Sequence, residues 1–134
     1  MYEIFISTVA NKFLTVAEIK QAVIQLSARN ISKNVTGILI YNEGAFYQIL
    51  EGDKNVLLDL METVKEDDRH GTVHTIWEGE IPKRGYKKWG LAPCMISKIG
   101  LDSIYAEKAD NVSTSQRLLE TLAKSSGFQY SSSH

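Results

Sequence analysis

Alternating and continuous apolar runs predict five strands in this chain. Residues 2–7 form a short β-prone run, after which a loop is expected. Two apolar runs at 35–41 and 45–51 are separated by a turn and predict a hairpin. Two more strands are predicted at 72–81 and 86–96. The chain therefore carries enough strand-forming sequence for a single sheet.

Helical periodicity separates these strands at two places. Apolar residues recur at spacings of three and four at about 16–29 and again at about 54–66. Thr15 and Glu18 form a capping box before the first helix, and Asp53 is the expected N-cap of the second. The order β-α-β-β-α-β-β predicts an α+β, ferredoxin-like sheet with both helices on one face.

The sequence changes character after about residue 97. Two further helices are expected at 101–109 and 113–124, where they would cover the other face of the sheet. We therefore divide the chain into a core domain at 1–97, a helical extension at 98–126 and a disordered tail at 127–134.

Composition limits the classes of protein that fit. The 134 residues are 43% hydrophobic and 23% charged with a net charge of −1, which is typical of one soluble domain and favours neither nucleic acid nor a membrane surface as partner. No apolar run reaches the roughly 18 residues of a membrane span, and a secretory signal is not evident. The basic segment 81–98 is interpreted as a solvated edge strand rather than a phosphate site. We expect a cytoplasmic protein.

Catalytic motifs are not evident in this chain. The histidines His70, His74 and His134 have no evident Ser or Cys partner. The single cysteine, Cys94, excludes an internal disulfide and is expected to pack within a late strand. The HExxH, Walker and CxxC patterns are missing. We therefore do not expect an enzyme.

One amide stands within the apolar hairpin. Gln48 has apolar neighbours at positions 47, 49 and 50, and a buried glutamine needs partners for two donors and an acceptor. Central strands have already committed their backbone groups to the sheet. Something polar, either protein or a bound ligand, should therefore lie against this part of the sheet.

Five segments carry a family resemblance when taken together. They are Ala28–Asn30, Val35–Tyr41, Gly44–Gly52, Asp67–His70 and Lys88–Gly90. At these spacings the chain resembles the BLUF family, small blue-light sensors that bind a flavin non-covalently. The resemblance implies a ferredoxin-like fold with the flavin ring between the two helices. It implies FAD as the cofactor, with FMN and riboflavin left open.

Two amides match ring-binding positions of that family. Asn30 matches the family's ring-binding asparagine, and a side-chain amide offers the donor and acceptor that an imide-like ring edge requires. The alternative for Asn30 is a helix C-cap. Gln48 matches the switch glutamine beside the flavin, with satisfaction by neighbouring backbone as its alternative.

Other family positions fall near the second helix and the last strand. Arg69, Asp67 and His70 match residues near the ring and the ribityl chain, although such a group also forms a simple charge cluster at a helix end. Trp89 matches a semi-conserved tryptophan, with a core role as its alternative. Leu91 stands where the family has a methionine, and with Gln48 and Trp89 it is implied in signal transmission.

The family's photoactive tyrosine is missing from the first strand. Phe5 is favoured at its position, on the assumption of a one-residue insertion in the following loop; without that insertion the residue is Ile6. Either side chain lacks the hydroxyl that donates a proton. We therefore expect flavin binding with a light-silent or altered response. Trp89, Tyr41 and Tyr47 are the substitute electron donors to consider.

The favoured function is therefore a flavin-binding photoreceptor domain that signals through protein contacts. A homo-oligomer and an unidentified downstream protein are its expected partners, reached through the last strand and the segment after residue 100. The alternative is a flavin-free ferredoxin-like domain for interaction or oligomerisation.

Overall fold

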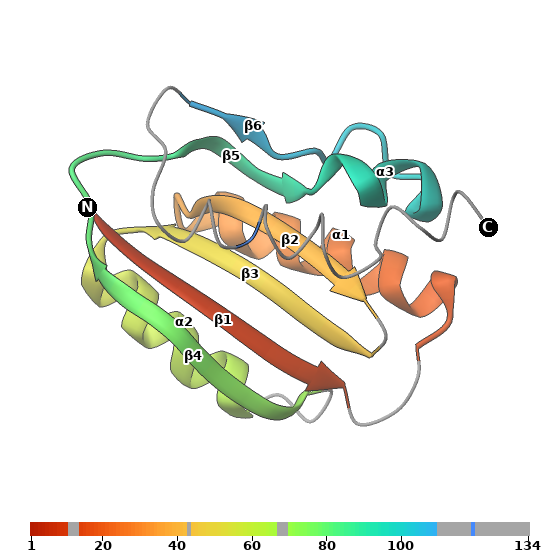
Figure 1. The fold of residues 1–134 in the computed structure, drawn as a ribbon, viewed down its shortest axis with the longest axis horizontal. Coiled ribbons are helices and arrows are strands. Elements are labelled where there is room, and N and C mark those ends of the chain that lie inside the picture. Colours follow the sequence, from red (N-terminus) through yellow and green to blue (C-terminus); the bar gives the residue numbers. More distant parts are fainter. Residues whose placement is uncertain (11–13, 43, 67–69, 110–118, 120–134) are drawn as a thin grey trace.

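The computed structural model describes residues 1–10, 14–42, 44–66, 70–109 and 119. Six strands form one mixed sheet in the order β4-β1-β3-β2-β5-β6. Helices α1 and α2 lie together on one face of this sheet (Figure 1). The ferredoxin-like α+β prediction is confirmed. The elements in chain order are β1 (Tyr2–Ala10), α1 (Val16–Ser32), β2 (Thr36–Asn42), β3 (Ala45–Gly52), α2 (Lys54–Glu66), β4 (His70–Glu80), β5 (Tyr86–Leu91), α3 (Pro93–Ile99) and β6 (Glu107–Lys108).

Local sequence accounts for where the two long helices begin. The Thr15 side chain accepts a hydrogen bond from the Glu18 backbone N–H, and the Glu18 carboxylate accepts one from the Thr15 backbone N–H, so the capping box is confirmed. Asp53 Oδ1 accepts from the N–H groups of Asn55 and Val56 and caps α2 as predicted.

The first strand is longer than predicted. β1 continues to Ala10 because Thr8 and Val9 pair with β3 on one side and β4 on the other. The predicted loop therefore begins later, and Thr8 becomes a fully buried residue of the sheet.

The end of the core also differs from the prediction. β5 stops at Leu91, and Pro93 starts α3, where proline's missing N–H is tolerated in the first helical turn. Cys94 is therefore part of a helix and not of a strand. The helix predicted at 101–109 is wrong, since this stretch contains the two-residue strand β6 that pairs with β5. The helix predicted at 113–124 lies outside the described residues except for Leu119, which is buried in the core.

Strand register assigns each side chain to one of two faces, because directly paired residues point to the same side. Tyr2 pairs with Gly52, and a Cβ added to Gly52 would touch Leu57 of α2. We call this side the helix-side face. It comprises Tyr2, Ile4, Ile6, Thr8, Leu39, Tyr41, Phe46, Gln48, Leu50, Trp89 and Leu91.

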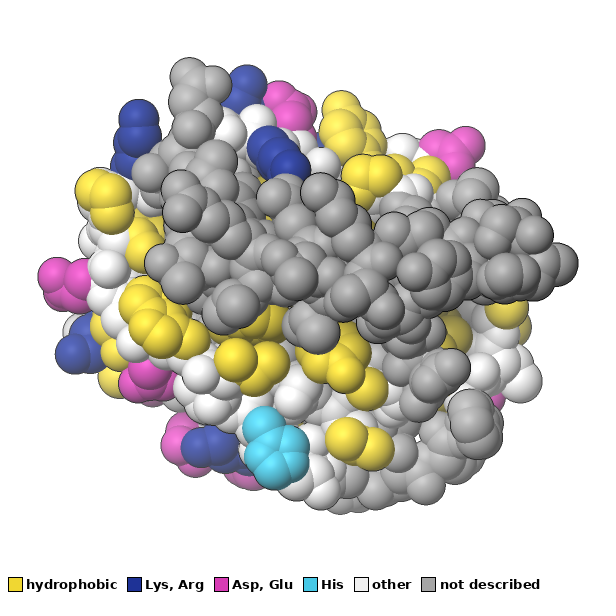
Figure 2. Space-filling view, viewed as in Figure 1, with side chains coloured by type: hydrophobic (Ala, Val, Ile, Leu, Met, Phe, Trp, Pro, Cys, Tyr) yellow, Lys and Arg dark blue, Asp and Glu magenta, His cyan; other side chains and the backbone are white. Residues whose placement is uncertain are grey.

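The other side of the sheet, the opposite face, is viewed directly in Figure 2, where hydrophobic side chains gather around its margins. Its central strands carry Phe5, Ile38 and Ile49, all buried. No helix in the described part of the chain is long and apolar enough to cross a membrane.

Candidate functional site

Gln48 lies at the centre of the helix-side face. It is only 2% exposed and pairs with Ile6 on β1 and with Leu39 on β2. The Trp89 indole N–H donates a hydrogen bond to Gln48 Oε1 over 3.3 Å. The predicted polar contact to this amide is therefore present within the protein, and it leaves the Gln48 NH₂ group for other partners.

Asn30 is a fully buried amide on α1. The helix continues to Ser32 and its C-cap is Lys33, so the alternative role of Asn30 as the cap is wrong. Its side chain is 0% exposed, and within the described part of the chain neither Oδ1 nor Nδ2 has a hydrogen-bond partner. Leaving a buried amide unpaired costs about 1–3 kcal/mol for each polar group, so this side chain calls for a polar ligand.

Two buried hydroxyls lie in the next row of the same face. Thr8 and Tyr41 both pair with Phe46, one from each side of β3, and neither hydroxyl has a hydrogen-bond partner in the part of the chain that the structure describes. The Tyr41 and Phe46 rings are in contact at 4.6 Å between centroids. Sequence reasoning missed Thr8, which it placed in a loop. The strand preference of threonine and valine at positions 8 and 9 was the available signal.

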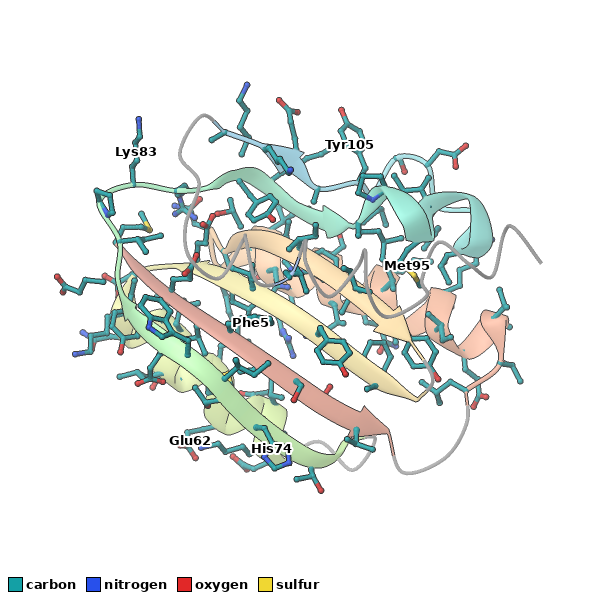
Figure 3. All side chains as sticks on the ribbon, viewed as in Figure 1. Phe5, Glu62, His74, Lys83, Met95 and Tyr105 are labelled. Carbon is teal, nitrogen blue, oxygen red and sulfur yellow. The ribbon has the colours of Figure 1, made fainter. Side chains whose placement is uncertain are left out.

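The strand register shows which of the two candidates for the tyrosine position, Phe5 or Ile6, lies beside Gln48. Phe5 pairs with Ile49 on the opposite face, in the middle of the sheet (Figure 3), whereas Ile6 pairs directly with Gln48. The preference for Phe5 is therefore corrected, because its side chain points away from Gln48. Ile6, the alternative that requires no insertion, is the residue beside this amide.

Trp89 and Leu91 join the site from β5. β5 runs parallel to β2, with Trp89 beside Gly37 and Leu91 beside Leu39. A Cβ on Gly37 would collide with the Ile49 carbonyl oxygen, so only glycine permits this approach of the strands. Both side chains are buried, and Trp89 combines its core position with the hydrogen bond to Gln48.

The predicted residues after α2 cannot be placed in the site. Asp67 and Arg69 lie outside the described residues. His70 is the first residue of β4, where its backbone pairs with Ala10. Of the predicted set, the structure brings Gln48 and Trp89 into contact, and it buries Asn30 on α1, which covers the same side of the sheet (Figure 1).

A second buried polar cluster occupies the opposite face and is internally satisfied. Glu51 Oε1 accepts from the Thr36 hydroxyl and the Tyr86 N–H, each at 3.0 Å, and Oε2 accepts from the Gly85 N–H at 2.7 Å. Arg84 donates to Thr36 Oγ1 at 2.7 Å and to backbone carbonyls. Burial raises the pKa of Glu51, and these hydrogen bonds oppose that rise. This cluster is a structural network.

The helix-side face is thus suited to a neutral ligand with several hydrogen-bonding atoms. The Gln48 amide and the hydroxyls of Thr8 and Tyr41 supply donors and acceptors within apolar surroundings. Among the described residues, no group of three or more His, Cys, Asp or Glu could hold a metal ion. An Asn and a Gln amide fit the donor and acceptor edge of a planar heterocycle.

Fold and site together define a small α+β domain with buried polar side chains on the helix side of its sheet. Comparison with known families narrows this class: residues 1–92 match the family model described as "Sensors of blue-light using FAD". The chain belongs to this family, BLUF, whose members are flavin-binding blue-light photoreceptor domains.

Relatives of this chain include parts of much larger proteins. It is 29% identical over 103 residues to a photoactivated adenylate cyclase subunit beta from Euglena longa, covering 76% of this chain and 12% of that subunit. The solved dark state of BlrB, a BLUF protein, is 26% identical with a TM-score of 0.60, covering 67% of this chain and 68% of BlrB. Klebsiella pneumoniae BlrP1, solved with FMN and cyclic diGMP, shares the fold at 19% identity and a TM-score of 0.73 over 94% of this chain and 36% of BlrP1.

Proposed function

We infer that this chain is a flavin-binding sensory domain in which Asn30 and Gln48 hold the polar edge of the flavin ring. The observation that carries this is the Asn30 amide, which is buried and has no hydrogen-bond partner among the described residues. FAD is the proposed flavin. Arg69, Asp67 and His70 are proposed as further contacts to the ring and its side chain.

Protein purified with its chromophore tests this function. A yellow protein from which acid releases FAD is expected, with chromatography of the extract distinguishing FAD from FMN and riboflavin. Colourless protein that cannot be reconstituted with any of the three flavins would support the alternative, a flavin-free interaction domain.

Each side chain has a definite task in this site. The bound flavin supplies absorption of blue light and, once excited, accepts an electron. Asn30 offers one donor and one acceptor, which orients a ring carrying the complementary pair. Trp89 holds Gln48 Oε1, so that the Gln48 NH₂ group is directed to the ligand.

We propose that the light response is silent or altered because Ile6 takes the place beside Gln48. An isoleucine side chain has neither an oxidisable ring nor a proton to give. Of the three substitute donors considered from the sequence, Trp89 and Tyr41 lie on the helix-side face, while Tyr47 belongs to the opposite face. Both could quench excitation without turning Gln48.

A pair of tyrosine substitutions tests this proposal. Under steady blue light the unmodified protein is expected to show no reversible red shift of its flavin bands. Ile6→Tyr should produce that shift, since it restores a phenol opposite Gln48. Phe5→Tyr is the matched control and should not, because position 5 faces the other way. A shift in the unmodified protein, or recovery only with Phe5→Tyr, would contradict the assignment.

Output is proposed to pass through protein contacts at the β5 edge, with a second copy or a downstream protein as partner. Trp89 ties Gln48 to β5, which pairs with β6 at that end of the sheet (Figure 1). Size-exclusion chromatography in light and dark, with Ile6→Tyr as the light-responsive form, tests this route. A cytoplasmic location remains a prediction.

A further inference from the structure

Thr8 is a buried threonine whose hydroxyl is left unused by the fold. It is 0% exposed, and Oγ1 has no hydrogen-bond partner among the residues that the structure describes. A hydroxyl removed from water without a partner destabilises the folded state, so one that is retained needs either an ordered water or a ligand. Valine would fill the same space without that penalty.

The position of Thr8 favours a ligand. It lies on the helix-side face of β1, two residues beyond Ile6, which pairs directly with Gln48. Thr8 and Gln48 are therefore diagonal neighbours on adjacent strands, separated by about 7–8 Å. A fused three-ring heterocycle that is hydrogen-bonded to the Gln48 amide is long enough to reach Thr8 as well.

We propose that the Thr8 hydroxyl is a third polar contact to the flavin ring, in addition to Asn30 and Gln48. Its O–H donates to a polar atom of the ring, which relieves the unpaired hydroxyl only when flavin is bound. This inference rests on the proposed flavin binding and assigns a residue to it that sequence reasoning had placed in a loop.

The test compares Thr8→Val with Thr75→Val. Thr75 lies on edge strand β4 and is exposed, so its substitution controls for the change of threonine to valine in a strand. Titration of the flavin-free protein with FAD should give a dissociation constant about tenfold higher for Thr8→Val and unchanged for the control. Urea unfolding of flavin-free protein should show Thr8→Val at least as stable as the unmodified chain.

Infrared spectra of the FAD-bound proteins identify which part of the flavin is touched. A ring contact predicts that the ring carbonyl bands move in Thr8→Val and stay in place in the control. Weaker binding without a band shift would place the contact on the ribityl side chain and overturn the assignment to the ring. Unchanged affinity would mean that the hydroxyl holds water, which overturns the proposal altogether.

Two further outcomes keep the test decisive. If Thr8→Val does not fold, Thr8→Ser and Thr8→Ala should fold, and only serine should preserve FAD affinity because it alone keeps the hydroxyl. Failure of the unmodified protein to bind any flavin would reject the proposed function itself. That result differs from weak binding confined to position 8, so the two failures can be told apart.

Discussion

Two sets of buried polar groups at the central sheet differ in how far the fold provides them with hydrogen bonds. On the opposite face, Glu51, Thr36 and Arg84 form a network in which the carboxylate receives three hydrogen bonds. On the helix side of the sheet, the Asn30 amide of α1 and the Thr8 hydroxyl of β1 are equally buried, and neither has a hydrogen-bond partner among the described residues. Both faces belong to the same strands, so fold alone does not explain the difference.

This contrast distinguishes buried polar groups that support the fold from buried polar groups that serve a function. A buried polar group that is satisfied by its neighbours stabilises or specifies the fold, whereas one that is left unpaired lowers stability and persists for another reason. Removing the first kind should destabilise the protein and leave ligand binding intact. Removing the second kind should weaken ligand binding and leave the flavin-free fold intact or more stable.

The largest expected effect concerns Asn30. Asn30→Leu keeps the shape and removes two unpaired polar groups, so the flavin-free protein should gain about 1–2 kcal/mol in free energy of unfolding. Loss of two ligand hydrogen bonds should raise the FAD dissociation constant by about 100-fold. Urea unfolding and FAD titration measure the two quantities. Asn55→Leu, at an exposed position of α2, is the control, and equal FAD affinity in both variants would argue against the site.

Thr36→Val makes the same chemical change as Thr8→Val, but on the opposite face. It removes a hydrogen bond to buried Glu51 and the acceptor of Arg84, and should lower the free energy of unfolding at pH 7 by about 1–3 kcal/mol. FAD affinity should stay within about twofold, since no helix-side group is touched. If Thr36→Val left the free energy of unfolding unchanged, or greatly weakened FAD binding, the proposed difference between the buried polar groups of the two faces would be contradicted.

The pH dependence of unfolding sharpens this second test. Because the folded pKa of Glu51 is raised above its usual 4.5, the folded protein binds more protons than the unfolded chain at pH values between the two pKa values. The contribution of Glu51 to stability is therefore full below pH 4.5 and is lost as pH rises through the folded pKa. Thr36 lowers that pKa, so Thr36→Val should lose more stability over this range than the unmodified chain. Parallel pH curves would contradict the network.

How far sequence predicts this molecule depends on whether a feature is local. The 3–4 spacing of apolar residues, the capping box at Thr15 and the cap at Asp53 identified both long helices, because each signal lies within a few residues. The prediction of a helix at 101–109 was wrong because part of this stretch pairs with β5 as strand β6. This pairing joins segments that are separated in the sequence. Tertiary pairing also extends β1 through Thr8.

Prediction of the site residues likewise succeeded where the signal was local and failed where it depended on tertiary pairing. Gln48 was found because an amide within an apolar strand is a local anomaly. The choice between Phe5 and Ile6 was not local, because a shift of one residue exchanges the two faces of a strand. Aromatic similarity favoured Phe5, but only the pairing with β3 reveals that Ile6 accompanies Gln48. The unpaired state of Asn30 likewise needs all of its neighbours to be known.

The smallest expected effect comes from two tyrosines of the central hairpin that lie on different faces. Tyr41 is on the helix-side face, and its buried hydroxyl has no hydrogen-bond partner among the described residues, whereas Tyr47 pairs with Ser7 on the opposite face. Tyr41→Phe should therefore leave the flavin-free protein as stable as before or up to about 1 kcal/mol more stable by urea unfolding. If Tyr41 quenches excited flavin, the same variant should lengthen the fluorescence lifetime of bound FAD, and Tyr47→Phe should not. Equal lifetimes in both variants would argue against Tyr41 as the quencher and favour Trp89, the other substitute donor on the helix-side face.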